Sequence, residues 1–272
     1  MDRGRSRRPQ GLKMGAIHLN RASVQGIPVL WAEPEHQEPR RLVIWLPGFS
    51  GTKEGVQQYL LELAAAGFVG LSFDPWEHGE RCAEGVEALR DRVRGNIRRH
   101  FWPILARTAE ETPQIVDWAL AEFGAQPALG MGGISMGGDI AVAAAGVDPR
   151  IAAVSAAIAT PDWLRPGSFE APGVPDGAAQ SDYDRRNPLT HLDSYRHCPA
   201  ISFQCGAQDQ QVPPDGAQRF VAALQGLYRE HPERLEVFLQ PVTAHQFTRT
   251  MWKNALSWFA RLDPETGDLK GS

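Results

Sequence analysis

The segment Gly-Ile-Ser-Met-Gly at residues 133–137 constrains the fold of this chain more than any other sequence feature. The apolar run 128–132 before it predicts a buried strand, and the alanine-rich run 138–146 after it predicts a helix. A Gly-x-Ser-x-Gly pentapeptide at such a junction is typical of a nucleophile elbow, which exposes a serine hydroxyl at the carboxyl edge of a sheet. Glycines flank the serine because the turn is too sharp for side chains there. Ser135 is therefore a candidate nucleophile.

Strand-like and helix-like patterns alternate along the rest of the chain. Residues 16–32 predict an antiparallel hairpin around Gln25-Gly26, and Thr112-Pro113 predicts the start of a helix that ends at Gly124. Further strands are predicted over 41–46, 68–73, 151–159, 200–205 and 235–239, and further helices over 53–66, 215–228 and 248–261. Such alternation indicates an α/β fold with a mostly parallel central sheet flanked by helices. We expect one domain over 15–264, a disordered basic tail over 1–14 and a flexible C-terminus over 265–272.

Residues 161–199 break this alternation, because they contain six prolines and several glycines. Irregular segments of this length are unusual inside a compact domain unless they are functional or disordered. Since the segment follows a predicted strand, we expect a lid-like insertion over Ser135; a solvated surface excursion is the alternative. The segment also holds residues that favour burial against the sheet edge, namely Trp163, Leu164, Phe169 and Tyr183. They predict a covered cleft and a preference for short acyl groups.

Composition narrows the class of protein. The net charge is −4, so the composition as a whole favours neither nucleic acid nor an anionic membrane as a partner, although residues 1–13 are basic. Within the sequence no apolar run is long enough to cross a bilayer, and the basic N-terminus lacks the apolar core of a secretory signal. Cys82, Cys198 and Cys205 are odd in number and share no Cys-x-x-Cys spacing, which argues against a disulfide framework or a zinc site. A cytoplasmic protein is therefore expected.

A serine nucleophile needs a histidine as base and usually a carboxylate that orients the histidine. In elbow-containing folds these residues follow the serine in the order acid, then histidine. His245 comes after the last predicted strand, which places it in a loop at the same sheet edge as Ser135. Asp209 ends the strand before that one, so we favour it as the acid. Asp162, which follows the predicted strand 151–159, is the rival acid.

Two backbone amides are expected to bind the oxyanion of the reaction. One belongs to Met136, the residue after the serine, and the other to Phe49 in the glycine-containing loop after strand 41–46. Aromatic residues near the predicted strand ends are candidates for a substrate pocket, although such residues are as often part of the core. The pocket candidates are Trp76, His78, Trp163 and Phe247, and the alternative for His78 is a packing role within its own loop.

Five stretches together carry a resemblance to a known superfamily. They are LPGFSG at 46–51, DPWEHGER at 74–81, GGISMGGD at 132–139, CGAQDQQVP at 205–213 and TAHQF at 243–247. From about residue 16 onward the chain resembles the α/β-hydrolases, above all small bacterial carboxylesterases related to dienelactone hydrolases and to the catalytic domain of prolyl oligopeptidases. The resemblance puts Ser135, Asp209 and His245 on triad positions and Phe49 and Met136 on oxyanion positions.

What the resemblance implies is hydrolysis of carboxylic esters through an acyl-enzyme, without a metal or an organic cofactor. Dienelactone itself is a doubtful substrate, because true dienelactone hydrolases typically use cysteine where this sequence has Ser135. The sequence contains no β-propeller, which makes peptidase activity less expected. Thioester, lactone or amide cleavage on the same residues, and a non-catalytic ligand-binding receptor, are the alternatives. The expected partner is a small ester, and the sequence leaves open whether the chain forms a homodimer.

Overall fold

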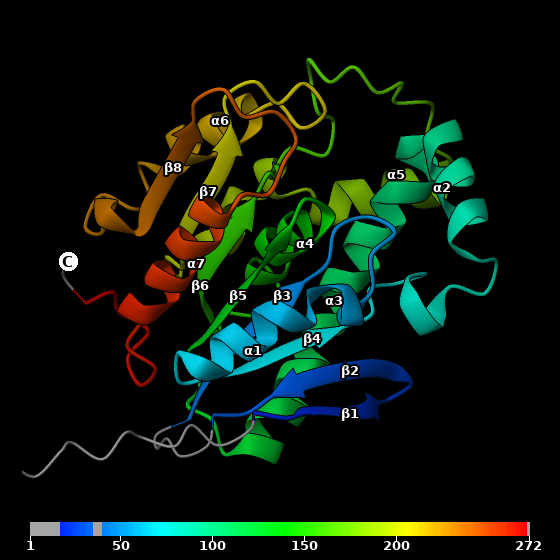
Figure 1. Ribbon diagram of the computed structural model, residues 1–272. Coiled ribbons are helices and arrows are strands. Elements are labelled where there is room, and N and C mark those ends of the chain that lie inside the picture. Colours follow the sequence, from blue (N-terminus) through cyan, green and yellow to red (C-terminus); the bar gives the residue numbers. More distant parts are fainter. Residues whose placement is uncertain (1–16, 35–39, 271–272) are drawn as a thin grey trace, which may run out of the picture.

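The computed structural model describes residues 17–34 and 40–270, and the predicted basic tail over 1–14 lies outside them. Within these residues eight strands form one sheet in the order β1-β2-β4-β3-β5-β6-β7-β8 (Figure 1). Both β1 and β4 pair antiparallel with β2, whereas every neighbouring pair from β4 to β8 is parallel. The strands are Leu19–Val24 (β1), Ile27–Ala32 (β2), Arg41–Leu46 (β3), Phe68–Phe73 (β4), Leu129–Ile134 (β5), Ile151–Ala157 (β6), Ala200–Gly206 (β7) and Leu235–Gln240 (β8). The predicted α/β fold with a mostly parallel sheet is confirmed.

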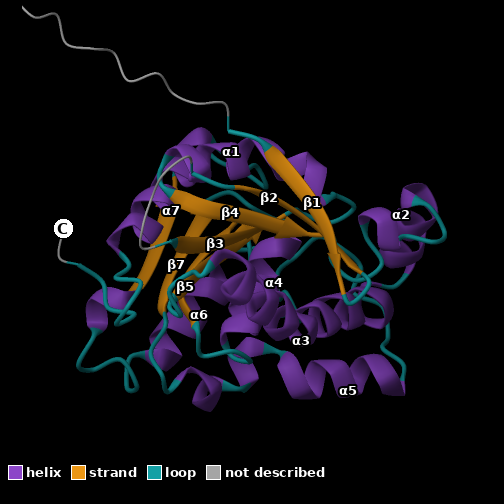
Figure 2. Ribbon diagram, turned by 90° about the horizontal axis from the view of Figure 1, so that it is seen from below, coloured by secondary structure: helices purple, strands orange, loops and turns teal. Residues whose placement is uncertain are grey.

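Helices cover both faces of the sheet (Figure 2). Their bounds are Gln57–Ala65 (α1), Val86–Gly95 (α2), Ile97–Phe123 (α3), Met136–Ala145 (α4), Gly177–Arg186 (α5), Asp215–Leu224 (α6) and Arg249–Arg261 (α7). Buried side chains of α1 and α7 pack in one hydrophobic cluster, and those of α3, α4 and α6 pack in a second cluster. Successive side chains of strand β3 point into different clusters: Leu42 and Ile44 belong to one, while Val43 and Trp45 belong to the other. This two-sided burial explains the unbroken apolar runs of the parallel strands.

The turn of the β1–β2 hairpin follows a simple local rule. At the predicted turn, Gln25 has φ of 49° and Gly26 has φ of 84°, the pair of left-handed residues that a tight two-residue hairpin requires.

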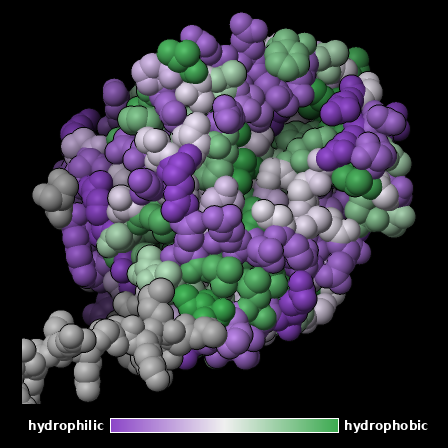
Figure 3. All heavy atoms as spheres, viewed as in Figure 1, coloured by the Kyte–Doolittle hydropathy of each residue, from purple (hydrophilic) through white to green (hydrophobic). Residues whose placement is uncertain are grey.

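On the face shown in Figure 3, hydrophilic residues make up most of the surface and hydrophobic residues show in smaller patches between them. Among the described residues, no helix combines the length and the apolar character needed to span a membrane.

The helix predicted to begin at Thr112-Pro113 is instead the second half of a longer one. Helix α3 runs without interruption from Ile97 and contains Pro103 and Pro113. Thr112 does not cap a helix, since its Oγ1 donates to the carbonyl oxygen of Thr108 inside α3 at 2.9 Å. An internal proline removes one helical hydrogen bond and costs about 3 kcal/mol. Burial of one face of α3, including Ile115, offsets that cost, which is why local propensity misplaced the helix start.

The insertion 161–199 is less irregular than its composition predicts. It contains the ten-residue helix α5, which packs against α3 and buries only Ala179 and Asp182 of its own side chains. So polar a helix carries no periodic apolar signal. Helix α2, which buries only Leu89 and Val93, was also missed. Trp163 is buried as expected, but Phe169 is 71% exposed.

Hydrogen bonds join the first residues of this insertion to residues 187–189. The Leu189 amide donates to the Pro161 carbonyl oxygen at 3.0 Å, and the Trp163 amide donates to Oδ1 of Asn187 at 2.9 Å. In its middle, the Pro172 carbonyl oxygen accepts from the amide of Arg98 at 2.9 Å. The insertion is thus fastened both to itself and to the first turn of α3.

The last described residues also contact the domain. Leu269 forms an antiparallel bridge with Leu262, and Asp268 forms an ion pair with Arg234. Residues 265–270, expected to belong to a flexible C-terminus, therefore pack against the chain, while 271–272 lie outside the described residues.

Candidate active site

Ser135 lies on a sharp turn between β5 and α4. Its φ of 52° and ψ of −114° are strained for a residue with a side chain, as a nucleophile elbow requires. A Cβ atom at Gly133 would come within 2.6 Å of the backbone of Gly137, and one at Gly137 would come within 2.6 Å of the Leu46 carbonyl oxygen. The two glycines of the pentapeptide are therefore required by the close approach of β3, β5 and α4.

The two residues predicted to act with Ser135 lie beside it. Nε2 of His245, in the loop between β8 and α7, is 3.1 Å from Oγ of Ser135. Nδ1 of the same ring is 2.7 Å from Oδ2 of Asp209, which follows β7. Because a carboxylate can only accept, Nδ1 carries the proton in neutral His245 and Nε2 is left to accept from the serine hydroxyl.

Asp209 is held firmly in this position. Its side chain is buried, and Oδ1 accepts from the amides of Gln211 at 3.0 Å and Val212 at 2.9 Å. These two bonds occupy one carboxylate oxygen and leave the other facing His245. The carboxylate is thereby oriented by the chain itself, without a second cation beside it.

The rival acid and a third aspartate are committed elsewhere. Asp162 forms an ion pair with Arg219 at 2.7 Å, and its other oxygen accepts from the Leu164 amide at 3.1 Å. Asp139, on α4, is fully buried and forms an ion pair with Arg165 at 2.7 Å. Burial raises the pKa of the Asp139 carboxyl, and the nearby Arg165 opposes that rise. Neither group contacts His245 by a hydrogen bond.

One expected oxyanion donor lies within the elbow, and the other lies in the loop after β3. Met136 is the first residue of α4, and Phe49 follows β3 in the loop that begins at Pro47. Neither backbone amide donates to another described residue, so both are available to a ligand. The Phe49 ring makes edge-on contacts with Phe101 and His78, with ring centroids 5.6 Å apart in each case. The position of this loop is thus set by packing.

Two adjoining cavities lie beside the insertion, and the first of them reaches Ser135. The first has a volume of about 90 Å³ and is lined by Ser135 together with Phe49, Phe101, Arg94, Gln211 and others. The second, of about 200 Å³, is lined mainly by insertion residues 163–172 and the first turn of α3. Ile97, Arg165 and Glu170 line both cavities, so they form a shared wall.

Within the described residues, none of the four predicted pocket residues lines the first cavity. The ring of Trp76 is stacked between Arg81 and Arg107, whose guanidinium carbons lie 4.9 and 5.1 Å from its centroid. Phe247 packs on Trp45 in the cluster on the far side of the sheet. The sequence could not separate cavity from core, because aromatic residues at strand ends serve both.

His78 and Trp163 have more specific roles. His78 is buried behind Phe49 and its Nδ1 donates to the Trp76 carbonyl oxygen at 2.9 Å. Desolvation lowers the pKa of His78, which keeps this ring neutral and favours the packing alternative. Trp163 lines the second cavity, and its carbonyl oxygen accepts from Trp102 at 3.0 Å.

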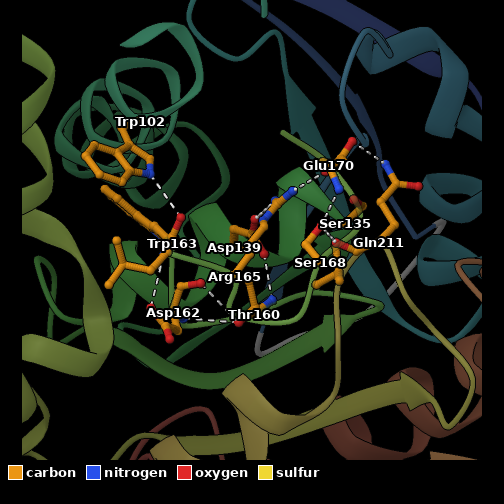
Figure 4. A network of polar contacts seen from close by, with 12 residues as sticks. Trp102, Ser135, Asp139, Thr160, Asp162, Trp163, Arg165, Ser168, Glu170 and Gln211 are labelled. Carbon is orange, nitrogen blue, oxygen red and sulfur yellow. Dashed lines mark hydrogen bonds and ion pairs between the residues drawn. The ribbon is translucent and has the colours of Figure 1, made fainter. Parts of the chain in front are cut away.

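The polar wall of the first cavity was not anticipated from the sequence. Figure 4 shows Arg165 between Asp139 and Glu170, with Gln211 beside Glu170. Nη1 of Arg165 is 3.4 Å from Glu170, and the Gln211 side-chain amide donates to the same carboxylate at 3.1 Å. Gln211 could have been suspected, because it lies two residues after Asp209. Arg165 and Glu170 carry no such signal, since loop contacts are not periodic.

In the described part of the chain no group of three or more His, Cys, Asp or Glu side chains could hold a metal ion. The three cysteines are free thiols, and burial raises the pKa of Cys205 to about 12.

Known proteins resemble this chain in sequence and in fold. The protein named "Putative esterase YitV" from Bacillus subtilis (strain 168) is 26% identical over 261 residues, which cover 89% of this chain and 98% of that protein. The crystal structure of TT1662 from Thermus thermophilus matches with a TM-score of 0.74 and 25% identity, covering 90% of this chain and 98% of the other. Pyrococcus horikoshii acylaminoacyl peptidase shares the fold at 18% identity and a TM-score of 0.65, over 93% of this chain and 42% of that one.

The model of one protein family matches residues 107–263, more than half of the chain. This region contains the elbow, the acid loop, the histidine loop and the whole insertion. Together with the parallel sheet and the esterase and hydrolase relatives, the match identifies an enzyme of the α/β-hydrolase type. The chain belongs to the prolyl oligopeptidase family within the α/β-hydrolase superfamily.

Proposed function

We propose that the protein is a serine esterase that hydrolyses short-chain carboxylic esters through an acyl-enzyme. The observation that carries this proposal is the pair of contacts from His245, 3.1 Å to Ser135 and 2.7 Å to Asp209. This is the arrangement in which a histidine takes a proton from a serine while a carboxylate stabilises the resulting imidazolium.

The reaction proceeds in two halves. In acylation, Nε2 of His245 takes the hydroxyl proton as Oγ of Ser135 attacks the ester carbonyl. The amides of Phe49 and Met136 donate to the oxyanion, and the alcohol leaves with the proton from His245. In deacylation, His245 takes a proton from water as the water attacks the acyl-enzyme carbonyl. It then returns the proton to Oγ of Ser135 as the bond to the acyl group breaks and the acid is released.

The size of the first cavity supports a short acyl group. Its volume of about 90 Å³ is well below the roughly 300–1,000 Å³ of pockets that take drug-sized ligands. Phe49 and Phe101 make its wall partly apolar, as an acyl chain of a few carbons requires. The name of the relative YitV, which covers nearly the whole chain, also favours an esterase.

Peptide cleavage on the same residues is the second candidate, and the family match favours it. Amides are harder to cleave than esters, so a peptidase would also hydrolyse activated esters. The two candidates therefore differ in whether short peptide amides are turned over at all.

A fluorophosphonate probe followed by peptide mapping tests the proposal. Labelling is expected at Ser135, and His245→Ala should slow it strongly because the serine then loses its base. An ester series and a peptide amide series, measured on the same preparation, separate the two candidates. Absence of labelling on the folded protein would contradict both and would favour a non-catalytic receptor.

A further inference from the structure

We infer that the enzyme selects esters that carry a carboxylate on the acyl chain, and that Arg94 and Arg98 bind that carboxylate. The inference rests on the proposed esterase function and adds the substrate class to it. Arg94 lines the first cavity together with Ser135, and Arg98 lines the second cavity beyond the shared wall.

Both arginines lack a carboxylate partner. Most arginine side chains around the site form ion pairs, such as Arg92 with Glu77 and Glu84 and Arg99 with Asp176. Among the described residues no ion pair involves the side chain of Arg94 or Arg98. The guanidinium carbon of Arg98 is 5.8 Å from the centroid of the Trp102 ring, Tyr183 lies nearby, and among the described residues the Nε of Arg98 has no hydrogen-bond partner.

The charges on the cavity walls leave an excess of positive charge. The walls carry Arg94, Arg98 and Arg165 against one lining carboxylate, Glu170. Counting the buried Asp139 behind Arg165 as well, three cations face two anions, a net charge of +1. Asp139 and Glu170 are both in contact with Arg165, so the excess lies at the other two arginines.

The geometry sets the length of the ligand. An ester whose carbonyl is at Ser135 places its first acyl carbons in the 90 Å³ cavity. A carboxylate at the far end of a short chain would then reach Arg94 or, past Ile97 and Glu170, Arg98 in the second cavity. Half-esters of dicarboxylic acids have this shape. We estimate about four to six carbons for the acid, because the pocket is smaller than those that take ligands of ordinary size.

The insertion and the helix ends hold these arginines in place. Arg94 is in the last turn of α2, and Arg98 is in the first turn of α3, where its amide donates to Pro172. Asn96, between the two helices, caps α3 and donates to the Val174 carbonyl oxygen at 2.8 Å. The contacts that fasten the insertion thus also position the cations, so a carboxylate would meet them without rearrangement of the backbone.

The test compares two esters of equal acyl length, monoethyl glutarate and ethyl pentanoate. Wild-type enzyme should have a higher kcat/KM for the anionic ester, and this preference should fall as salt screens the charges. Arg94→Gln and Arg98→Gln should each lower the anionic-to-neutral ratio by about fivefold, the value of one partly exposed ion pair. Arg99→Gln is the matched control, because Arg99 is a neighbouring exposed arginine that lines neither cavity.

A binding measurement separates this inference from the proposed function. In Ser135→Ala, which cannot turn over the ester, monoethyl glutarate should bind measurably by calorimetry and should bind less tightly after Arg94→Gln or Arg98→Gln. Binding with no hydrolysis by the wild type would refute the esterase proposal and leave the carboxylate site standing. Equal ratios in wild type and both variants, or an equal loss in Arg99→Gln, would overturn the carboxylate site.

Discussion

The proposed catalytic residues and the wall of the first cavity are built in different ways. Ser135, Asp209 and His245 each follow a strand of one parallel sheet, and their loops are short. Arg165 and Glu170 come from the insertion and are held by ion pairs between long side chains. Sheet topology thus brings the three proposed catalytic residues together, because parallel strands end at one edge. The cavity wall depends on contacts that topology does not dictate.

The largest effect is expected at the reacting groups. Ser135→Ala and His245→Ala should each lower kcat by about 10⁴- to 10⁶-fold, and the double variant should be little worse, because the residues act as a unit. Circular dichroism should show an unchanged fold. A double variant that is much slower than either single one would mean that the two residues do not share a step.

The next prediction separates the two acids. Asp209→Asn should lower kcat by about 10⁴-fold, because an amide no longer holds the proton on Nδ1 of His245. Asp162→Asn should change kcat little, since this residue is engaged by Arg219. Steady-state kinetics on one activated ester gives kcat for both variants. A larger loss of kcat in Asp162→Asn than in Asp209→Asn would place the acid in the loop after β6.

A stability measurement probes the insertion. Arg165→Gln should lower the free energy of unfolding by about 3 kcal/mol, because it leaves the buried Asp139 without its cation. The pKa of Asp139 is already raised by burial and would rise further in the variant. The folded state then binds more protons than the unfolded state above the ordinary carboxyl range, so stability falls as pH rises. The variant should therefore lose more stability at pH 8 than at pH 5 in denaturant titrations; an equal loss at both would count against the buried pair.

The smallest effect concerns acyl length. Ile97→Ala should shift the preference in an ester series towards acyl chains longer by about one or two carbons, since each accommodated methylene changes kcat/KM by about tenfold or more. Trp163→Ala, in the second cavity only, should leave the preference among unsubstituted acyl chains unchanged. If Trp163→Ala shifts the profile and Ile97→Ala does not, the assignment of the two cavities is reversed.

The sequence predicted the parts of this molecule that repeat local patterns. Apolar runs and turn glycines located the parallel strands, and strand ends then located the loops of Ser135, Asp209 and His245. The start of α3 was missed because tertiary burial overrides the proline at 113. The cavity wall was missed because pairs such as Arg165 with Asp139 are 26 residues apart and depend on how a loop folds back. Phe247, predicted as a pocket residue, packs on Trp45 instead of lining the first cavity, because an aromatic side chain after a strand can face either layer.

The part of the insertion between residues 161 and 189 has an evolutionary consequence. Because Pro161 contacts Leu189 and Trp163 contacts Asn187, the two ends of this part lie side by side. A segment with adjacent ends can be lengthened, shortened or exchanged at little entropic cost to the rest of the domain. Proteins that descend from one ancestral hydrolase could thus acquire new substrates by exchanging this one segment, while the elbow and the residues around it are unchanged.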